Sequence, residues 1–205
     1  MPNKRVVVAM SGGVDSSVAA LLLNQAGFDV IGVTLRLWTI NREDTNPLHQ
    51  GCCSVEDTDD ARSVCQELGI RHYVINAEKE FQNHVVDYFV QEYKRGRTPH
   101  PCIACNDRIK FDFLLNRSLA MDAEFIATGH YARTITDRDG FTHLLRGVDE
   151  GKDQSYVLFG LQQHQLQRLL LPVGEFPKGS IREIAAQNNL PIATKPDSQD
   201  ICFIP

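Results

Sequence analysis

A glycine-rich turn near the N-terminus contains the residues whose types and order most directly suggest chemistry. Ser11, Gly12 and Gly13 follow the apolar run 6–10 and precede a helix-forming segment that starts at Asp15. Adjacent glycines let the backbone turn tightly and bring its amides close to a ligand. Free amides at a helix N-terminus and the helix dipole both favour a phosphate. We therefore predict a phosphate site between a buried strand and a helix.

This turn matches neither of two well-known nucleotide-binding motifs. It lacks the lysine that a Walker A loop requires, and its glycines do not have the GxGxxG spacing. The remaining alternative is an ordinary βα turn without a ligand, which the agreement of strand, turn and helix disfavours.

Three of the six cysteines lie where thiol chemistry is plausible. Cys102 and Cys105 form a C-x-x-C motif in a proline-containing segment, and Cys202 lies about a hundred residues further on. A reactive thiol needs access and a lowered pKa, and three nearby cations would favour the thiolate: Arg97, Arg108 and Lys110. Two mechanisms stay open beside structural burial. In one, a cysteine persulfide is attacked by another cysteine; in the other, three thiolates hold an iron–sulfur cluster with one iron open to sulfide. Four well-spaced zinc ligands are not evident.

The other cysteines fit packing better. Cys65 falls in the middle of an expected helix, as a small buried hydrophobe does. Cys52 and Cys53 precede that helix, a position that lowers a thiol pKa, but structural packing is the favoured interpretation. The chain has no secretory signal and no apolar run long enough for a membrane, so we predict a cytoplasmic protein without membrane association or a disulfide framework.

The elements that must position these residues alternate between strands and helices. Strands are predicted at 6–10, 29–35, 72–75 and 125–128, and helices at 54–68, 80–95 and 107–121. We expect 39–51 to be a loop and 98–106 to be extended, because two prolines disfavour a helix there. A hairpin is predicted at 133–136 and 142–146, followed by short helical pieces after 152. This pattern predicts a doubly wound parallel α/β sheet.

Ligands of such a sheet bind at the carboxyl ends of its strands. Ser11, Leu35, Gly129 and His130 all lie at predicted strand ends, so we expect one site to collect them.

Length and charge set broader limits. The 205 residues, 42% of them hydrophobic, suit one α/β domain with a sizeable core. A net charge of −5 does not indicate nucleic-acid binding, but the local clusters 94–97 and 108–110 would attract a polyanion. The alternative for each cluster is a solvated helix end.

Several stretches together resemble one family. SGGVDS by itself resembles the PP-loop of the ATP pyrophosphatases, which cleave ATP between its α and β phosphates and have the adenine nucleotide alpha hydrolase-like fold. Together with GRTPHPCIACN, IKF, ATGHYA, GKDQSY and DSQDICFI, it resembles the tRNA-specific 2-thiouridylase family over essentially the whole chain.

That resemblance implies an ATP-dependent sulfurtransferase. It would place sulfur at C2 of the wobble uridine, uridine 34, in the tRNAs for Lys, Glu and Gln, through an adenylated uridine. ATP and Mg²⁺ are the implied cofactors. The implied partners are tRNA and a sulfur-donor protein of a persulfide relay.

The family's motifs also imply roles for residues at matching positions. Cys105 matches the nucleophile and Cys202 the persulfide-bearing cysteine, and the two would form a disulfide once sulfur has left. The implied ATP contacts are Ala9, Met10, Ser11, Gly12, Gly13, Val14, Asp15, Ser16, Leu35 and Gly129. The implied tRNA contacts are the target-base loop His100, Pro101 and Cys102, together with His130, Lys152, Asp153 and Gln154.

The chain departs from the family's common pattern at Cys102, where many members have an aspartate. This puts a carboxylate acid/base role at that position in doubt. It also supplies three candidate ligands for a [4Fe–4S] cluster: Cys102, Cys105 and Cys202. The persulfide relay and the cluster therefore both stay open.

We expect residues 1–205 to form one PP-loop thiolation domain, in which about 150–205 begin a helical extension. The family's central domain and C-terminal β-barrel are expected to be absent from this chain, as in part of a longer protein. Two other functions are kept as alternatives. One is another PP-loop adenylating enzyme, of the amidotransferase synthetase type; the other is a non-catalytic metal or redox module that uses C-x-x-C.

Overall fold

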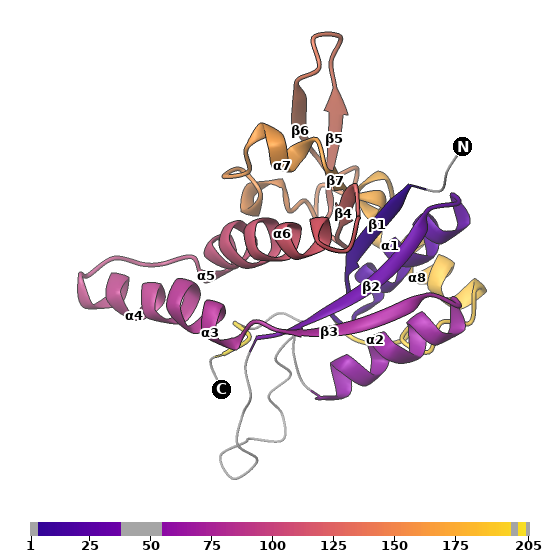
Figure 1. Cartoon of the computed structure of the whole chain (residues 1–205), viewed down its shortest axis with the longest axis horizontal. Helices are drawn as coiled ribbons and strands as arrows, with labels where there is room; N and C mark the ends of the chain where they lie inside the picture. The colour runs from indigo at the N-terminus through magenta and orange to yellow at the C-terminus, as the bar shows by residue number, and fades with distance from the viewer. Residues whose placement is uncertain (1–3, 38–54, 198–200, 204–205) are drawn as a thin grey trace.

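A five-stranded parallel sheet with strand order β3-β2-β1-β4-β7 forms the centre of the molecule (Figure 1). The structure, a computed structural model, describes residues 4–37, 55–197 and 201–203. The strands are β1 (Arg5–Ala9), β2 (Asp29–Arg36), β3 (Arg71–Asn76), β4 (Phe125–Ala127) and β7 (Leu169–Leu170). All four neighbouring pairs are parallel, which confirms the predicted sheet. The two-residue strand β7 was not predicted.

Helices cover both faces of this sheet, so the doubly wound arrangement is also confirmed (Figure 1). Val6 and Val8 of β1 point into one core with α1 (Val14–Gln25), α2 (Val55–Glu67) and α8 (Lys178–Gln187). Val7 points into the other core, which contains side chains of the π-helix η3 (Cys105–Phe113) and of α6 (Leu114–Leu119). From β1 the chain adds β2 and β3 on one side of the sheet and then β4 and β7 on the other. Ligands bind such sheets at the point where the order switches sides.

The remaining elements extend from this frame. A helical arm consists of α3 (Glu78–Phe81), η2 (Gln82–Val86) and α4 (Asp87–Lys94), and it corresponds to the helix predicted at 80–95. The predicted hairpin is confirmed as β5 (Ala132–Thr136) paired with β6 (Thr142–Arg146). The predicted short helical pieces are also present: η4 (Ser155–Val157), α7 (Gln163–Leu166), η5 (Pro172–Glu175) and α8. In the described part of the chain, no helix has both the length and the apolar character to cross a membrane.

The prediction that 98–106 is extended was wrong at its second half. Helix α5 (Pro101–Ala104) begins there and continues directly into η3. Proline is tolerated at the first helical position, because its missing N–H would have no partner in the helix and its fixed φ suits the helix. Pro101 therefore starts a helix instead of preventing one. As a result, Cys102 and Cys105 lie one helical turn apart and not in an extended loop.

The predictions for the other cysteines have separate outcomes. Cys65 is buried in the core, and burial raises the pKa of its thiol to about 12, so its interpretation as an inert packing residue is confirmed. The described residues do not include Cys52, Cys53 or the predicted loop 39–51. They also do not include Ser54, where the second helix was predicted to start.

Gly32 in β2 provides a test of how tightly the sheet and α2 are packed. A Cβ atom at this position would lie 2.5 Å from Cys65 Sγ and 3.3 Å from Met10 Cγ. We predict that Gly32→Ala lowers the free energy of unfolding by about 1–3 kcal/mol, the usual cost of overpacking. In a Cys65→Ala background the sulfur is gone, so the added cost of Gly32→Ala should fall below about 1 kcal/mol. Urea unfolding of the four proteins measures both costs, and equal costs in the two backgrounds would contradict this packing.

Candidate active site

The glycine turn is held in place by hydrogen bonds from the start of α1. Gly12 has φ +72°, and a Cβ there would lie 2.2 Å from the Asp57 carbonyl oxygen at the start of α2. Conformation and space therefore both require glycine. Ser17 Oγ donates to the Gly13 carbonyl oxygen at 2.8 Å. Among the described residues no side chain caps the α1 N-terminus, so its amides face the turn ready for an anion.

The end of β4 closes against the same helix start. A Cβ on Gly129 would lie 2.6 Å from the Ser16 backbone nitrogen and 2.7 Å from the Asp15 carbonyl carbon. Only a residue without a side chain permits this approach. Leu35, at the end of β2, is buried. Ser11, Leu35, Gly129 and His130 line one cavity, so the structure brings together the residues predicted at the strand ends.

That cavity has a volume of about 440 Å³ and brings the predicted residues together. Apart from Gly12 and Asp153, every residue predicted to contact ATP or tRNA or to handle sulfur lines it. The glycine turn and the thiols therefore share one space large enough for a small ligand.

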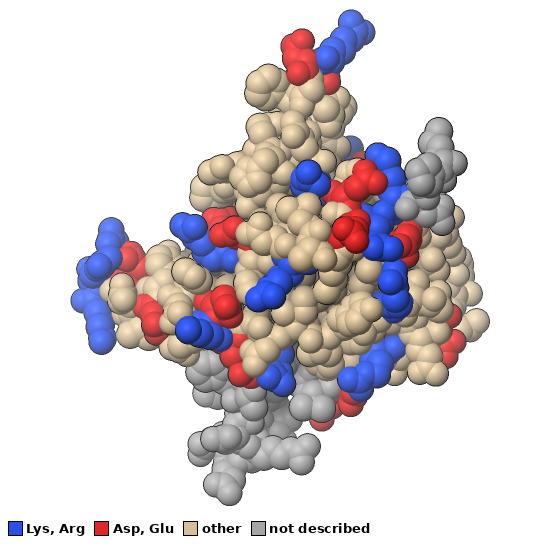
Figure 2. All heavy atoms as spheres, viewed as in Figure 1, with Lys and Arg blue, Asp and Glu red and all other residues tan. Residues whose placement is uncertain are grey.

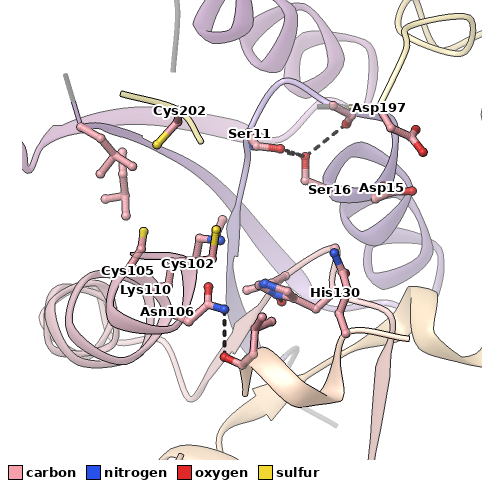
Figure 3. A pocket seen from close by; sticks show the side chains of 18 of the residues that line it. Ser11, Asp15, Ser16, Cys102, Cys105, Asn106, Lys110, His130, Asp197 and Cys202 are labelled. Atoms are coloured by element: carbon pink, nitrogen blue, oxygen red, sulfur yellow. Dashed lines mark hydrogen bonds between the residues drawn. The ribbon is translucent and has the colours of Figure 1, made fainter. Parts of the chain in front are cut away.

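The three candidate thiols enter the cavity from two sides. Figure 3 shows Cys102 and Cys105 on their helix, with Cys202 on the opposite wall. Cys105 is buried, Cys202 is half-buried and Cys102 is exposed. Next to Cys105, the buried Asn106 donates a 3.1 Å hydrogen bond to the Val157 carbonyl oxygen and so anchors the helix to η4 (Figure 3).

The predicted cluster ligands are not arranged as a metal site in this structure. The described residues include Cys102, Cys105 and Cys202, and they contain no group of three or more His, Cys, Asp or Glu side chains that could hold a metal ion. The geometry thus gives no support to the [4Fe–4S] alternative, which stays a prediction.

An ion-pair cluster that the sequence did not reveal lies at the other end of the cavity. Lys178 Nζ is 2.7 Å from Asp15 Oδ1 and 2.8 Å from Asp197 Oδ1. Asp197 also pairs with Lys152 at 3.0 Å and with Arg182 at 2.8 Å. We call Asp15, Lys152, Lys178, Arg182 and Asp197 the Asp197 cluster. Its members come from distant parts of the chain, so no local motif signals it.

Two neighbouring groups complete this charged end. Lys195 pairs with Asp57 and Asp60 on α2; burial would lower the pKa of Lys195, but its hydrogen bonds to these carboxylates raise it. The Tyr131 hydroxyl donates to Asp15 Oδ1 at 2.7 Å. Burial and this hydrogen bond both raise the pKa of Tyr131, so the hydroxyl keeps its proton.

The predicted tRNA contacts have different surroundings. Burial, followed by the charge of Lys110, holds the pKa of His130 well below its usual value, so its imidazole is neutral at neutral pH. Asp153 accepts hydrogen bonds from the Gly147 amide and the Ser155 hydroxyl, each at 2.8 Å, and it lies outside the cavity lining. Its carboxylate therefore holds the loop that presents Lys152 to the cavity. Gln154 lines the cavity and accepts from the Tyr131 amide at 3.0 Å.

The two predicted basic clusters differ in position. Figure 2 shows basic side chains gathered at the free end of the α4 arm, where Lys94, Arg95 and Arg97 lie. Arg95 and Arg97 both pair with Glu92, so one carboxylate offsets only part of this charge. In the second cluster, Lys110 lines the cavity. Attraction of a polyanion to these clusters stays a prediction.

A doubly wound sheet with a glycine turn at its switch point and no Walker lysine defines a nucleotide-binding domain of the PP-loop type. The chain belongs to the family described as the tRNA methyl transferase HUP domain, whose model matches residues 4–205.

Curated relatives share more than half of their aligned residues with this chain. It is 54% identical over 202 residues to "tRNA-specific 2-thiouridylase MnmA" of Lachnoclostridium phytofermentans, covering 98% of this chain and 57% of that protein. It is 53% identical over 204 residues to the protein of the same name from Carboxydothermus hydrogenoformans, covering 99% and 56%. The chain thus spans a little over half the length of these relatives.

Solved structures with low sequence identity share the fold. A 4-thiouridine synthetase in complex with RNA and ATP matches with a TM-score of 0.58 and 19% identity, over 98% of this chain and 45% of that one. NMN synthetase from Francisella tularensis matches with a TM-score of 0.54 and 18% identity, over 96% and 67%. These matches confirm the predicted PP-loop fold.

From the ion pairs of Asp197 we predict that the stability of the fold depends on pH. Burial would raise the pKa of its carboxyl, but hydrogen bonds from Lys178 and Lys152 outweigh burial and lower the pKa from 3.8 to about 2. A carboxyl with a depressed folded-state pKa stabilises the fold above its unfolded-state pKa, and this stability is lost as the pH falls through the folded-state pKa. The contribution should be about 2 kcal/mol at neutral pH and should disappear between about pH 4 and pH 2.

Urea unfolding of the protein and of Asp197→Asn at several pH values measures this contribution. The difference in unfolding free energy should be largest above about pH 5 and should shrink toward pH 2. As a control, Asp139→Asn at the exposed hairpin turn should change stability by less than about 0.5 kcal/mol throughout. A difference for Asp197→Asn that does not vary with pH would show that the ion pairs do not depress the pKa.

Proposed function

We propose that this protein is an ATP-dependent sulfurtransferase that converts the C2 carbonyl of uridine 34 in the tRNAs for Lys, Glu and Gln to a thiocarbonyl. One observation carries the proposal: a single cavity has a phosphate-type glycine turn at one end and the thiols of Cys105 and Cys202 at the other. The names of the curated relatives support the same reaction. A cytoplasmic location belongs to the same proposal.

The first half of the proposed reaction activates the uridine. The amides of the glycine turn at the α1 N-terminus bind the phosphates of ATP, and the uridine O2 attacks the α-phosphorus. Pyrophosphate leaves, and the oxygen at C2 becomes part of an AMP leaving group. The neutral imidazole of His130 suits a hydrogen bond to an uncharged base better than one to a phosphate.

The second half replaces that oxygen by sulfur. A donor protein supplies a persulfide on Cys202, and the terminal sulfur attacks C2 and displaces AMP. The Cys105 thiolate then attacks the Cys202 sulfur, so that a Cys105–Cys202 disulfide forms and one sulfur stays on the base. A thiol reductant must reduce this disulfide before the next turnover. Cys105 and Cys202 line the same cavity, which supports this sequence (Figure 3).

The cavity also has oxygen donors suited to Mg²⁺. Carboxylates of Asp15 and Asp197 face a common point next to the glycine turn, since both pair with the same ammonium. Two carboxylates with phosphate oxygens are a usual donor set for Mg²⁺. These residues would hold the ion, which would offset charge on the departing pyrophosphate.

The assay of the proposed function uses protein purified without oxygen. It is incubated with unmodified tRNA for Glu, ATP, Mg²⁺ and a persulfide donor, and nucleosides and pyrophosphate are measured by mass spectrometry and enzymatic assay. We expect 2-thiouridine to form only with ATP. Pyrophosphate release without 2-thiouridine would indicate adenylation with a different sulfur source. Neither product would favour another PP-loop adenylating enzyme, and thiol chemistry without ATP would favour the redox module.

The cysteine variants separate the mechanisms. With a persulfide donor, Cys105→Ser and Cys202→Ser should abolish 2-thiouridine formation but retain tRNA-dependent pyrophosphate release, because the phosphate end is untouched. Cys65→Ala is the matched control, since this buried thiol lies outside the cavity and should affect stability only. The relay predicts activity in Cys102→Ser, whereas a cluster predicts its loss. Normal thiolation by Cys105→Ser would rule out its role as the nucleophile.

A further inference from the structure

We infer that Lys178 is the cation that binds the β- and γ-phosphates of ATP and so distinguishes ATP from AMP. This inference rests on the proposed use of ATP and assigns a phosphate-binding residue outside the glycine turn. The turn SGGVDSS contains no lysine. A helix N-terminus supplies only about half a positive charge, so most of the charge that balances a triphosphate must come from other elements.

Lys178 lies where such a charge is needed. It is the first residue of α8, which packs against α1, and its side chain is only 12% exposed. Its ammonium pairs with Asp15, the second residue of α1, at 2.7 and 2.9 Å. Lys178 lines the cavity together with Ser11, Gly13 and Ser16. The ammonium is therefore beside the amides that would bind the phosphates.

The other lysines of the cavity fit this role less well. Lys110 lies next to Cys102 and Cys105, on the wall opposite the glycine turn (Figure 3). Lys152 is 40% exposed, and its ion pair in the described part of the chain is with Asp197. Lys195 is held by Asp57 and Asp60 on α2. Among these lysines, Lys178 is the one whose ammonium contacts α1 directly.

The surrounding ion pairs allow Lys178 to exchange partners. When its ammonium turns to a phosphate, Asp15 keeps the hydrogen bond from the Tyr131 hydroxyl. Asp197 keeps its pairs with Lys152 and Arg182. Neither carboxylate becomes a buried charge without a partner, which is the state that makes breaking an ion pair costly. The exchange reverses when pyrophosphate leaves, so AMP gains nothing from Lys178.

Nucleotide binding without tRNA tests this inference. We would titrate the purified protein, Lys178→Gln and Lys4→Gln with ATP and with AMP by isothermal titration calorimetry, with Mg²⁺ present. Losing a charge-assisted hydrogen bond to phosphate should weaken ATP binding about 10- to 100-fold in Lys178→Gln. AMP affinity should change less than about threefold in this variant. Lys4→Gln is the matched control, because Lys4 also forms an ion pair, with Glu124, but does not line the cavity, and its ATP-to-AMP affinity ratio should stay unchanged.

A second measurement needs no variant. Acetylation of the unsubstituted protein, followed by peptide mass spectrometry, should show that ATP slows labelling of Lys178 and that AMP does not. The exposed Lys4 serves as the internal control and should label equally under both conditions.

The outcomes separate the inference from the proposed function. If the unsubstituted protein binds neither nucleotide, the proposed use of ATP fails and the inference with it. If it binds ATP but Lys178→Gln keeps the same ATP-to-AMP ratio, or if ATP and AMP protect Lys178 equally, only the role of Lys178 is overturned.

Discussion

The site depends on the close approach of backbones around the glycine turn. Gly129 at the end of β4 leaves no room for a Cβ against Ser16, and Gly12 leaves none against the start of α2. These contacts bring two helix N-termini and two strand ends to one point. Hydrogen bonds then fix the turn, and the cavity opens beside it. A methyl group at either glycine would displace the amides on which anion binding depends.

Much of this frame follows from local sequence. The run of apolar residues in β1 predicts a strand buried on both faces, and Val6 and Val7 do point into different cores. Once the sheet is parallel, chain geometry places the residues after its strands at one edge. For this reason Leu35 and His130 could be assigned to the same site without any knowledge of their contacts. The buried Cys65 was predictable for a similar reason, since its position in a helix already indicated packing.

The sequence did not show how the site is completed. Pro101 is compatible with an extended segment and with the first position of a helix, and packing of Ile109 and Phe111 into the core accompanies the helix that forms. The Asp197 cluster joins residues as far apart as Asp15 and Lys178, and no periodicity marks such pairs. Strand β7 is two residues long and exists through its pairing with β4. Each of these features depends on contacts between distant segments.

The cavity is electrically divided, and this division bears on the proposed order of steps. Ion pairs gather around α1 and α8, whereas the wall with Cys105 contains the neutral amide of Asn106 and the cation Lys110. A thiolate close to a triphosphate would be repelled by it, and its nucleophilic attack would be opposed by that charge. Placing the phosphates against helix N-termini and lysines, with Cys105 and Cys202 at the far end, reduces this repulsion. The departure of pyrophosphate then removes most of the remaining negative charge before sulfur must reach the base, so activation before thiolation is the order that this distribution of charge favours.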